Sequence, residues 1–156
     1  MSLRRDNPLA LLRLVWRARR PSAIDDMPTV KNNFWLRQGY EAMTFFGVIV
    51  TATEREAEAM CRGMSALKRH ETIHLRQAQS TGDSWLRFYL LYIWYYLRAL
   101  PQNRHMTNAA YRLNPFELEA YRHMYEEGYE ILEANEWRRW AKIKPRERRL
   151  MIQNKS

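Results

Sequence analysis

The sequence contains little cysteine and little glycine. Its single cysteine, Cys61, excludes an internal disulfide framework, and nothing in the chain requires an oxidising compartment. Only five of the 156 residues are glycine, which disfavours a turn-rich all-β fold. Long periodic stretches rich in Ala, Leu, Met, Arg and Glu instead favour helices. We therefore predict a mainly helical domain with a minor β component.

Long apolar runs are also absent. The longest run of apolar and aromatic side chains, Phe88–Leu97, has ten residues, whereas a transmembrane helix needs roughly 20. The apolar piece Leu9–Trp16 is interrupted by Arg13 and lacks a small-residue cleavage site, so it does not make a convincing secretory signal. We expect a cytoplasmic protein in which residues 88–97 form a buried core helix. A position of these aromatic side chains at a membrane interface stays open as an alternative.

The net charge of +9 is concentrated at the two ends of the chain. Residues 1–20 carry +5 and residues 137–156 carry +7, which leaves −3 for the stretch between them. Basic ends suggest contact with an anionic surface, although solubilising tails would look the same. Trp137 and Trp140 alternate with arginines, a mixture that suits nucleic acid or a lipid headgroup layer. No nucleic-acid-binding fold motif accompanies it, so nucleic acid is disfavoured, and an anionic membrane surface stays open as a partner of the basic ends.

Composition and local signals divide the chain into three segments. Residues 1–33 are predicted as a basic helix, from Asn7-Pro8 to about Arg19, followed by an irregular linker. Residues 34–136 form the helical domain, and residues 137–156 a basic tail. Capping and breaking residues predict helices over 34–43, 54–63, 66–82, 85–100 and 115–135, with a polar connection over 101–114. Val48–Thr51, the only β-branched run, is the one predicted strand.

The segment His70-Glu71-Thr72-Ile73-His74 has the spacing His-Glu-x-x-His. On a helix, positions i and i+4 lie on the same face, so His70 and His74 can both bind one ion while Glu71 activates a water beside it. A chance match is expected in about 1% of chains of this composition. Both histidines fall on the apolar side of the predicted helix, where hydrogen-bonded core histidines would also fit. The glutamate between them favours a metal site.

A catalytic zinc site usually has three protein ligands and one open position. Glu117 and Glu119, near the start of the helix after Pro115, are the candidates for the third ligand. They are two residues apart, so they point to nearly opposite faces. Helical phase places Glu117 on the buried stripe and favours it as the ligand, although a glutamate at this third position can instead cap the helix. Glu119 falls on the solvated face, where we expect a surface role or an outer contact to a histidine.

These residues resemble a known group. A His-Glu-x-x-His helix followed about forty residues later by Glu117-x-x-Ala120 is similar to the gluzincin zinc metallopeptidases. In that group a downstream helix completes the site with Glu-x-x-x-Asp, and its Asp commonly orients a ligand histidine. Tyr121 stands at the Asp position here, so another group would have to orient the histidine. Gln77, one turn past His74, is either such a contact or a helix-packing amide.

A closer resemblance is to small, largely uncharacterised bacterial proteins. They share the order His-Glu-x-x-His-x-x-Gln, an aromatic helix, Ala110-Tyr111-Arg112, and Pro-x-Glu-x-Glu-Ala-Tyr from Pro115 to Tyr121. The resemblance covers roughly residues 45–135. It implies a compact, zincin-like helical domain with one short β element beside the zinc-bearing helix.

The expected function is zinc-dependent hydrolysis of a peptide or protein substrate. His70, His74 and Glu117 would bind Zn2+, and Glu71 would act as the general base. Tyr111 or Arg112 would stabilise the oxyanion, although Tyr111 can equally be a packing residue. The strand Val48–Thr51 would be the sheet edge to which the substrate adds, or else an ordinary core strand. The alternatives are a non-catalytic zinc-binding or interaction protein, and a peripheral protein at a membrane or another anionic surface.

Overall fold

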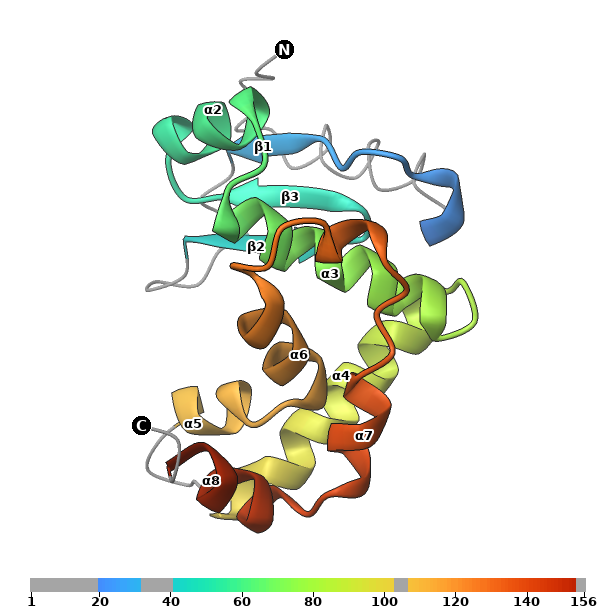
Figure 1. The fold of residues 1–156 in the computed structure, drawn as a ribbon, viewed down its shortest axis with the longest axis vertical. Helices are drawn as coiled ribbons and strands as arrows, with labels where there is room; N and C mark the ends of the chain where they lie inside the picture. Colours follow the sequence, from blue (N-terminus) through green and yellow to red (C-terminus); the bar gives the residue numbers. More distant parts are fainter. Residues whose placement is uncertain (1–19, 32–40, 103–106, 154–156) are drawn as a thin grey trace.

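The computed structural model describes residues 20–31, 41–102 and 107–153, which form seven α-helices and a three-stranded sheet (Figure 1). The helices are α2 (Glu54–Arg62), α3 (Ala66–Ser80), α4 (Trp85–Ala99), α5 (Thr107–Arg112), α6 (Pro115–His123), α7 (Trp137–Lys142) and α8 (Pro145–Gln153). Three short 3-10 turns complete them: η1 (Pro21–Ala23), η2 (Leu100–Gln102) and η3 (Tyr129–Ile131). The predicted mainly helical class with a minor β part is confirmed. The predicted basic helix ending near Arg19 lies outside the described residues.

The sheet contains β1 (Thr29–Lys31), β2 (Ala42–Phe45) and β3 (Val48–Thr51), in the spatial order β1-β3-β2. Strand β3 pairs in parallel with β1 and antiparallel with β2, and all four of its residues are buried. The predicted strand Val48–Thr51 is therefore confirmed, but the prediction of only one strand was wrong. Strand β1 lies in the predicted linker, and β2 begins within the predicted helix 34–43. Pairing with β3 satisfies backbone groups of these two segments, which are only three and four residues long.

A two-residue turn, Phe46-Gly47, joins β2 to β3. Both residues have positive φ angles, 46° and 82°, as the type I′ hairpin turn requires. Phe46 adopts this uncommon conformation because it is held from outside the hairpin. Its N–H donates to the hydroxyl of Tyr89 on α4 at 3.1 Å, and its ring centroid lies 4.7 Å from that of Tyr89. The turn is thereby anchored to α4.

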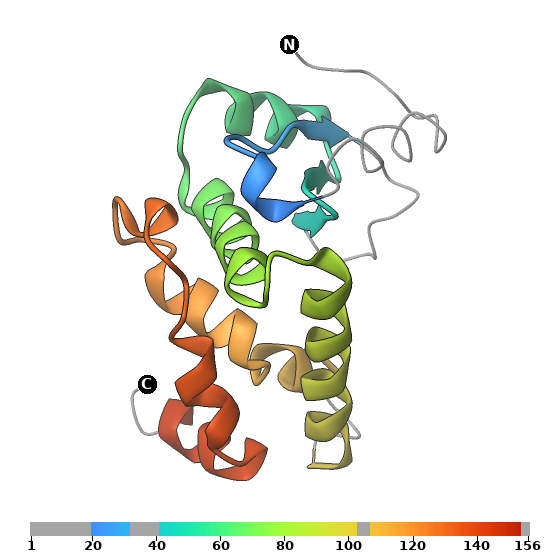
Figure 2. The ribbon, with the colours of Figure 1, turned by 90° about the vertical axis from the view of Figure 1, so that its right-hand side faces the viewer.

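The described fold is elongated, with the sheet and α2 at one end and α5 and α8 at the other (Figures 1 and 2). Helix α2 packs on β1 and β3, and α3 packs on β2. The sheet and the helices α2, α3, α4, α6 and α7 all contribute to an apolar core. Its largest cluster of buried residues comprises Met27, Ala42, Ile49, Met60, Leu75, Ala78, Trp85, Phe88, Phe116 and Trp137.

The predicted helix starts at Thr53, Ser65, Ser84 and Asn114 are confirmed, whereas the predicted connection 101–114 and the predicted end of the helix from Pro115 are wrong. Thr53 and Glu56 form the capping box of α2, and Ser65 and Ser84 cap α3 and α4. However, the predicted polar connection 101–114 contains α5, and the helix from Pro115 ends at His123 rather than near residue 135.

A tertiary contact explains the early end of α6. The Nη1 of Arg69 on α3 donates to the carbonyl of Met124, 2.9 Å away, where the helix ends. Further along, Gly128 has a φ of 85°, which redirects the chain into η3. Because Arg69 is distant in sequence, the local pattern of α6 does not reveal this end point.

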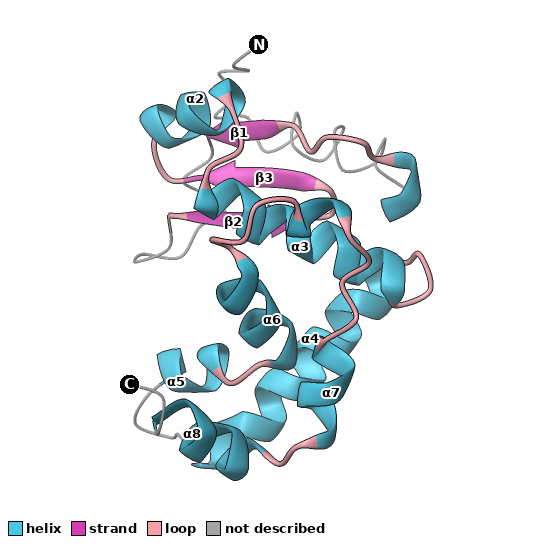
Figure 3. Ribbon diagram, viewed as in Figure 1, coloured by secondary structure: helices cyan, strands magenta, loops and turns pink. Residues whose placement is uncertain are grey.

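The residues predicted as a basic tail form helices α7 and α8 as far as Gln153 (Figure 3). Trp137 is 7% exposed and Trp140 9% exposed, so both rings belong to the interior. Trp137 contacts Phe116 with ring centroids 4.7 Å apart. The two indoles therefore do not present a surface for nucleic acid or lipid headgroups. Within the described ranges, none of the helices combines the length and apolarity that crossing a membrane requires.

Two substitutions on α4 test how the helix is oriented. Phe88 is 2% exposed and contacts Phe116, whereas Leu86 is 64% exposed. Phe88→Ala is expected to lower the free energy of unfolding by about 4 kcal/mol, since it leaves a cavity in the core. Leu86→Ala on the same helix should change it by less than about 0.5 kcal/mol. Urea denaturation measures both values, and losses of similar size would contradict this orientation.

Candidate metal centre

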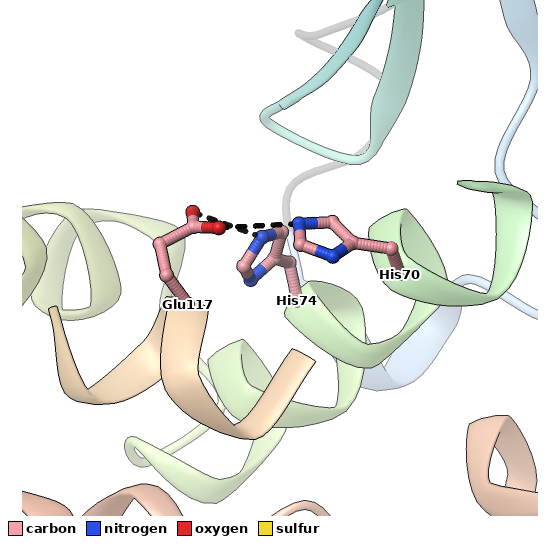
Figure 4. A group of neighbouring side chains, drawn as sticks. All are labelled: His70, His74 and Glu117. Atoms are coloured by element: carbon pink, nitrogen blue, oxygen red, sulfur yellow. Dashed lines mark ion pairs between the residues drawn. The ribbon is translucent and has the colours of Figure 1, made fainter. Parts of the chain in front are cut away.

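Three metal-ligating side chains from two helices meet in the interior (Figure 4). His70 and His74 lie one turn apart on α3, and Glu117 lies in the first turn of α6. His70 Nε2 is 3.2 Å from Glu117 Oε2, and His74 Nε2 is 3.3 Å from Glu117 Oε1. Two atoms that bind one zinc ion at about 2.05 Å in tetrahedral geometry are about 3.4 Å apart. The two distances are therefore compatible with a shared ion.

The hydrogen bonding of Glu117 leaves room for a cation. Its Oε1 accepts a hydrogen bond from the hydroxyl of Tyr92 on α4 at 2.7 Å, but its Oε2 has no hydrogen-bond partner although it is buried. Buried polar atoms are nearly always paired. A cation held by the three donors, whose ligand atoms lie within 4.8 Å of one another, would satisfy this oxygen. The group can thus hold a metal ion. The carboxylate does not bond back to the start of its own helix, where Asn114 provides the cap.

His74 and Glu117 shift each other's pKa. Burial alone would lower the pKa of His74, but the charge of Glu117 and a hydrogen bond to it raise this pKa to about 9. Burial alone would raise the pKa of Glu117, whereas His74 and His70 together bring it far below the usual carboxyl range. Without a metal, a proton on His74 supplies the positive charge that the buried carboxylate needs. A metal ion has to displace that proton.

Gln77 fixes the orientation of the His74 ring. Its Nε2 donates to the carbonyl of Phe116 at 2.9 Å and to Glu119 at 2.8 Å. Since a carbonyl only accepts, the amide oxygen Oε1 must be the atom that lies 2.7 Å from His74 Nδ1. His74 Nδ1 therefore carries a proton, and Nε2 is the nitrogen available to a metal. Both roles considered for Gln77 are observed: its amide oxygen orients His74, and its amide nitrogen joins α3 to α6.

Helical phase predicted that Glu119 lies on a solvated face. This prediction was wrong, because Glu119 is 0% exposed. Besides Gln77, its carboxylate accepts hydrogen bonds from the hydroxyl of Tyr129 at 2.9 Å and from the backbone N–H groups of Glu136 (2.8 Å) and Trp137 (3.3 Å). These two N–H groups are at the start of α7, which has no side-chain cap of its own. Glu119 therefore stabilises the positive end of α7. It is an outer contact to His74, made through Gln77.

Glu71 is buried beside the triad and faces a cavity. The hydroxyl of Thr44 in β2 donates to Glu71 Oε2 at 2.7 Å. A cavity of about 310 Å³ is lined by His70 and Glu71. Its other walls include Ala42, Leu67, Tyr111, Arg112, Tyr121 and Met124. The otherwise buried site can therefore be reached from the side on which Glu71 lies.

Two tyrosines line this cavity with different surroundings. The ring centroid of Tyr121 lies 4.5 Å from that of His70 in an edge-to-face contact, so the residue at the expected Asp position contacts a histidine through its ring. Tyr121 is 43% exposed, which makes it a wall of the cavity rather than a core residue. Burial and the negative charge of Glu117 raise the pKa of Tyr111 far above its ordinary value. Tyr111 is therefore a neutral hydroxyl at the edge of the site.

The sequence did not reveal two of the residues that support the site. Tyr92 is one of several aromatic residues in α4, and nothing in their spacing distinguishes the one that reaches Glu117. Thr44 lies in β2, which begins within the predicted helix 34–43, so its contact with Glu71 could not be foreseen. Both contacts join segments that are far apart in the chain.

Comparison of the chain with protein-family models, with curated proteins and with solved structures finds no match. The triad itself is consistent with an arrangement of His-Glu-x-x-His plus a downstream glutamate. Function therefore has to be inferred from the side chains of the site.

The role of Glu119 can be tested by removing its charge. Glu119→Gln replaces one acceptor oxygen by an N–H2 group that faces donors, so the free energy of unfolding should fall by about 3 kcal/mol. Glu127→Gln, a matched change at an exposed position, should stay within about 0.5 kcal/mol of the parent protein. Chemical denaturation measures both. An effect of Glu119→Gln as small as that of the control would show that this carboxylate does not support α7.

Proposed function

We propose that the protein is a zinc-dependent hydrolase that cleaves peptide bonds. His70, His74 and Glu117 bind the zinc ion, and Glu71 is the general base. The observation that carries this proposal is the cavity, which reaches His70 and Glu71 while the triad is otherwise buried. The resemblance of the sequence to gluzincins supports the same reaction class.

The donor set supports zinc as the metal. Two imidazole nitrogens and one carboxylate oxygen are typical ligands of this ion. Structural zinc sites have four protein ligands, whereas catalytic sites keep one position open. The metal-ligating group found in the described residues has three members. When bound, zinc supplies a Lewis acid that polarises a carbonyl oxygen and makes a water more acidic.

The protein's own residues would move the protons. Glu71 takes a proton from the attacking water and passes it to the leaving amine. The hydrogen bond from Thr44 holds the Glu71 carboxylate toward β2 and limits its rotation. Tyr111, a neutral hydroxyl in the same cavity, donates to the oxyanion that develops on the substrate carbonyl. Each of these residues lines the cavity or contacts one that does.

The sheet suggests how an extended peptide would bind. Of the two roles considered for Val48–Thr51, the sheet edge is excluded and the core strand is observed, because β3 lies between β1 and β2. In the described sheet β2 is an edge strand, and its Ala42 lines the cavity together with Glu71. A substrate that adds to β2 by backbone pairing would run past the site. We therefore propose β2 as the strand that binds the substrate.

A non-catalytic zinc site is the second candidate, favoured by the burial of the triad, whose side chains are 1–7% exposed. Such a site needs the two histidines and Glu117 but has no use for Glu71. The bond between Glu71 and Thr44 beside a cavity argues for the catalytic role.

Metal content tests the ligands. The purified protein is expected to hold about one zinc ion per chain. His74→Ala should lose the metal, because it removes one of three ligands. A chelator should lower the melting temperature of the parent protein but not that of His74→Ala. His123→Ala is the matched control, since His123 pairs with Glu126 and Glu136 away from the triad. Elemental analysis measures the zinc. Equal zinc content in His74→Ala and the parent protein would contradict the assignment.

Replacement of the base tests catalysis. Glu71→Gln should keep its zinc but lower kcat on a peptide library by about 10²–10⁴-fold, because the amide cannot accept the proton. Glu58→Gln, on an exposed part of α2, should leave turnover unchanged. Mass spectrometry of the products measures the rate. Zinc binding without turnover in the parent protein would favour the non-catalytic site, and undiminished turnover in Glu71→Gln would reject Glu71 as the base.

A further inference from the structure

Helix α4 has an apolar stripe on the side turned away from the core. The stripe consists of Leu86 (64% exposed), Leu90 (60%), Ile93 (53%), Trp94 (56%) and Leu97 (51%). At 3.6 residues per turn these five positions fall on one face of the helix. Figure 2 shows α4 along one edge of the described fold. Extended apolar patches of this kind are uncommon on monomeric proteins and often mark an interaction site.

The opposite face of α4 is already occupied. Phe88 lies in the core, and the Tyr92 hydroxyl donates to Glu117. The helix is therefore apolar nearly all round, a pattern that normally occurs where a helix is enclosed on every side. The described residues enclose only one side of it.

The charges around the stripe are positive. Within α4 only Arg87 and Arg98 are charged, and both are exposed. On a helical wheel they fall on one flank of the stripe, beside Trp94, and the Arg98 guanidinium lies 5.9 Å from the Trp94 ring. The nearest acidic residue in the sequence, Asp83, is bonded to Ser22. A stripe of Leu, Ile and Trp with arginines along one flank matches the interface of an anionic membrane.

Helix α7 contacts α4 on the side of the arginines. On the helical wheel, Tyr95 lies beyond Arg98, farther from the stripe. Its ring contacts Trp137 with centroids 6.5 Å apart. Helix α7 thus packs beside α4 on the arginine side. Its exposed basic residues are Arg138, Arg139 and Lys142.

We propose that the apolar stripe of α4 docks on the surface of an anionic lipid bilayer. The five apolar side chains enter the boundary between headgroups and acyl chains, and Arg87 and Arg98 bind lipid phosphates at the flank. This surface lies on the described fold itself and differs from the basic ends considered in the sequence. Docking leaves the contact between Tyr92 and Glu117 untouched, because that contact is on the other face of the helix.

A second copy of the chain is a weaker candidate for the occupant. A stripe on one helix offers on the order of 500 Å², whereas each partner in a stable dimer buries roughly 800 Å². A two-fold interface centred on α4 would also bring the arginines of both copies together. Lipid phosphates, by contrast, neutralise these charges.

Vesicle co-sedimentation of the full chain tests the proposal. The probes are vesicles of phosphatidylcholine alone and vesicles in which a third of the lipid is phosphatidylglycerol. The parent protein should sediment with the anionic vesicles, and less so as salt is added. Leu90→Ser/Ile93→Ser should bind at least about tenfold more weakly, because it removes apolar area from the stripe. Ile131→Ser, at a 73% exposed position outside α4, should bind like the parent protein.

A charge variant and a folding control complete the design. Arg87→Gln/Arg98→Gln should bind anionic vesicles more weakly than the parent protein, and the binding that remains should depend less on salt. All variants should keep the melting temperature of the parent protein. Equal binding by the stripe variant and the parent protein, or no binding by either, would overturn the proposal. A parent dimer that becomes monomeric in Leu90→Ser/Ile93→Ser, without vesicle binding, would assign the stripe to a second copy instead.

Discussion

Helix α6 buries two carboxylates, Glu117 and Glu119, that are separated by a single residue. An ionised carboxylate costs several kcal/mol to bury unless partners surround it. Because the two side chains point to nearly opposite sides of the helix, partners are needed on both sides. Helix α3 supplies His70, His74 and Gln77, and the start of α7 supplies backbone N–H groups. The packing of α3, α6 and α7 follows from this requirement.

The two carboxylates differ in how completely they are paired. Glu119 accepts four hydrogen bonds, from Gln77, Tyr129 and two backbone N–H groups. The buried Oε2 of Glu117 lies 3.2 Å from His70 Nε2 in an ion pair. The first arrangement stabilises the fold, and the second is suited to a cation. Gln77 joins them, since one amide group contacts both Glu119 and His74. The orientation of a candidate ligand is thereby tied to the cap of a helix.

Helix α4 supports the site from a third direction. Tyr92 donates to Glu117, and Tyr89 donates to the carbonyl of Thr44, whose hydroxyl contacts Glu71. The Tyr89 hydroxyl also accepts a hydrogen bond from the N–H of Phe46, in the turn between β2 and β3. The inner face of α4 thus positions groups at both the triad and the candidate base, while its outer face presents the apolar stripe. One helix therefore contributes to the proposed chemistry and to the proposed membrane contact.

The features that were predicted correctly depend on residues close together in the chain. Helix starts at Ser65 and Asn114, the shared face of His70 and His74, and the strand Val48–Thr51 follow from local spacing and propensity. Helical phase also distinguished Glu117, as the candidate ligand, from Glu119. However, the expectation that the Glu119 side of the helix is solvated was wrong. A helix with neighbours on two sides has two buried faces, and a single helical pattern cannot show that.

The sequence by itself therefore determined the donor set His70, His74 and Glu117 and the helices that carry it, because those depend on short-range periodicity. Only the tertiary structure decided the partners: Gln77 and Glu119 behind His74, Tyr92 on Glu117, Thr44 on Glu71, and the central position of β3. Each of these is set by contacts with elements distant in the chain. It also decided which side of α4 is covered, since the residues on both sides of that helix are apolar and its pattern has no polar face to expose.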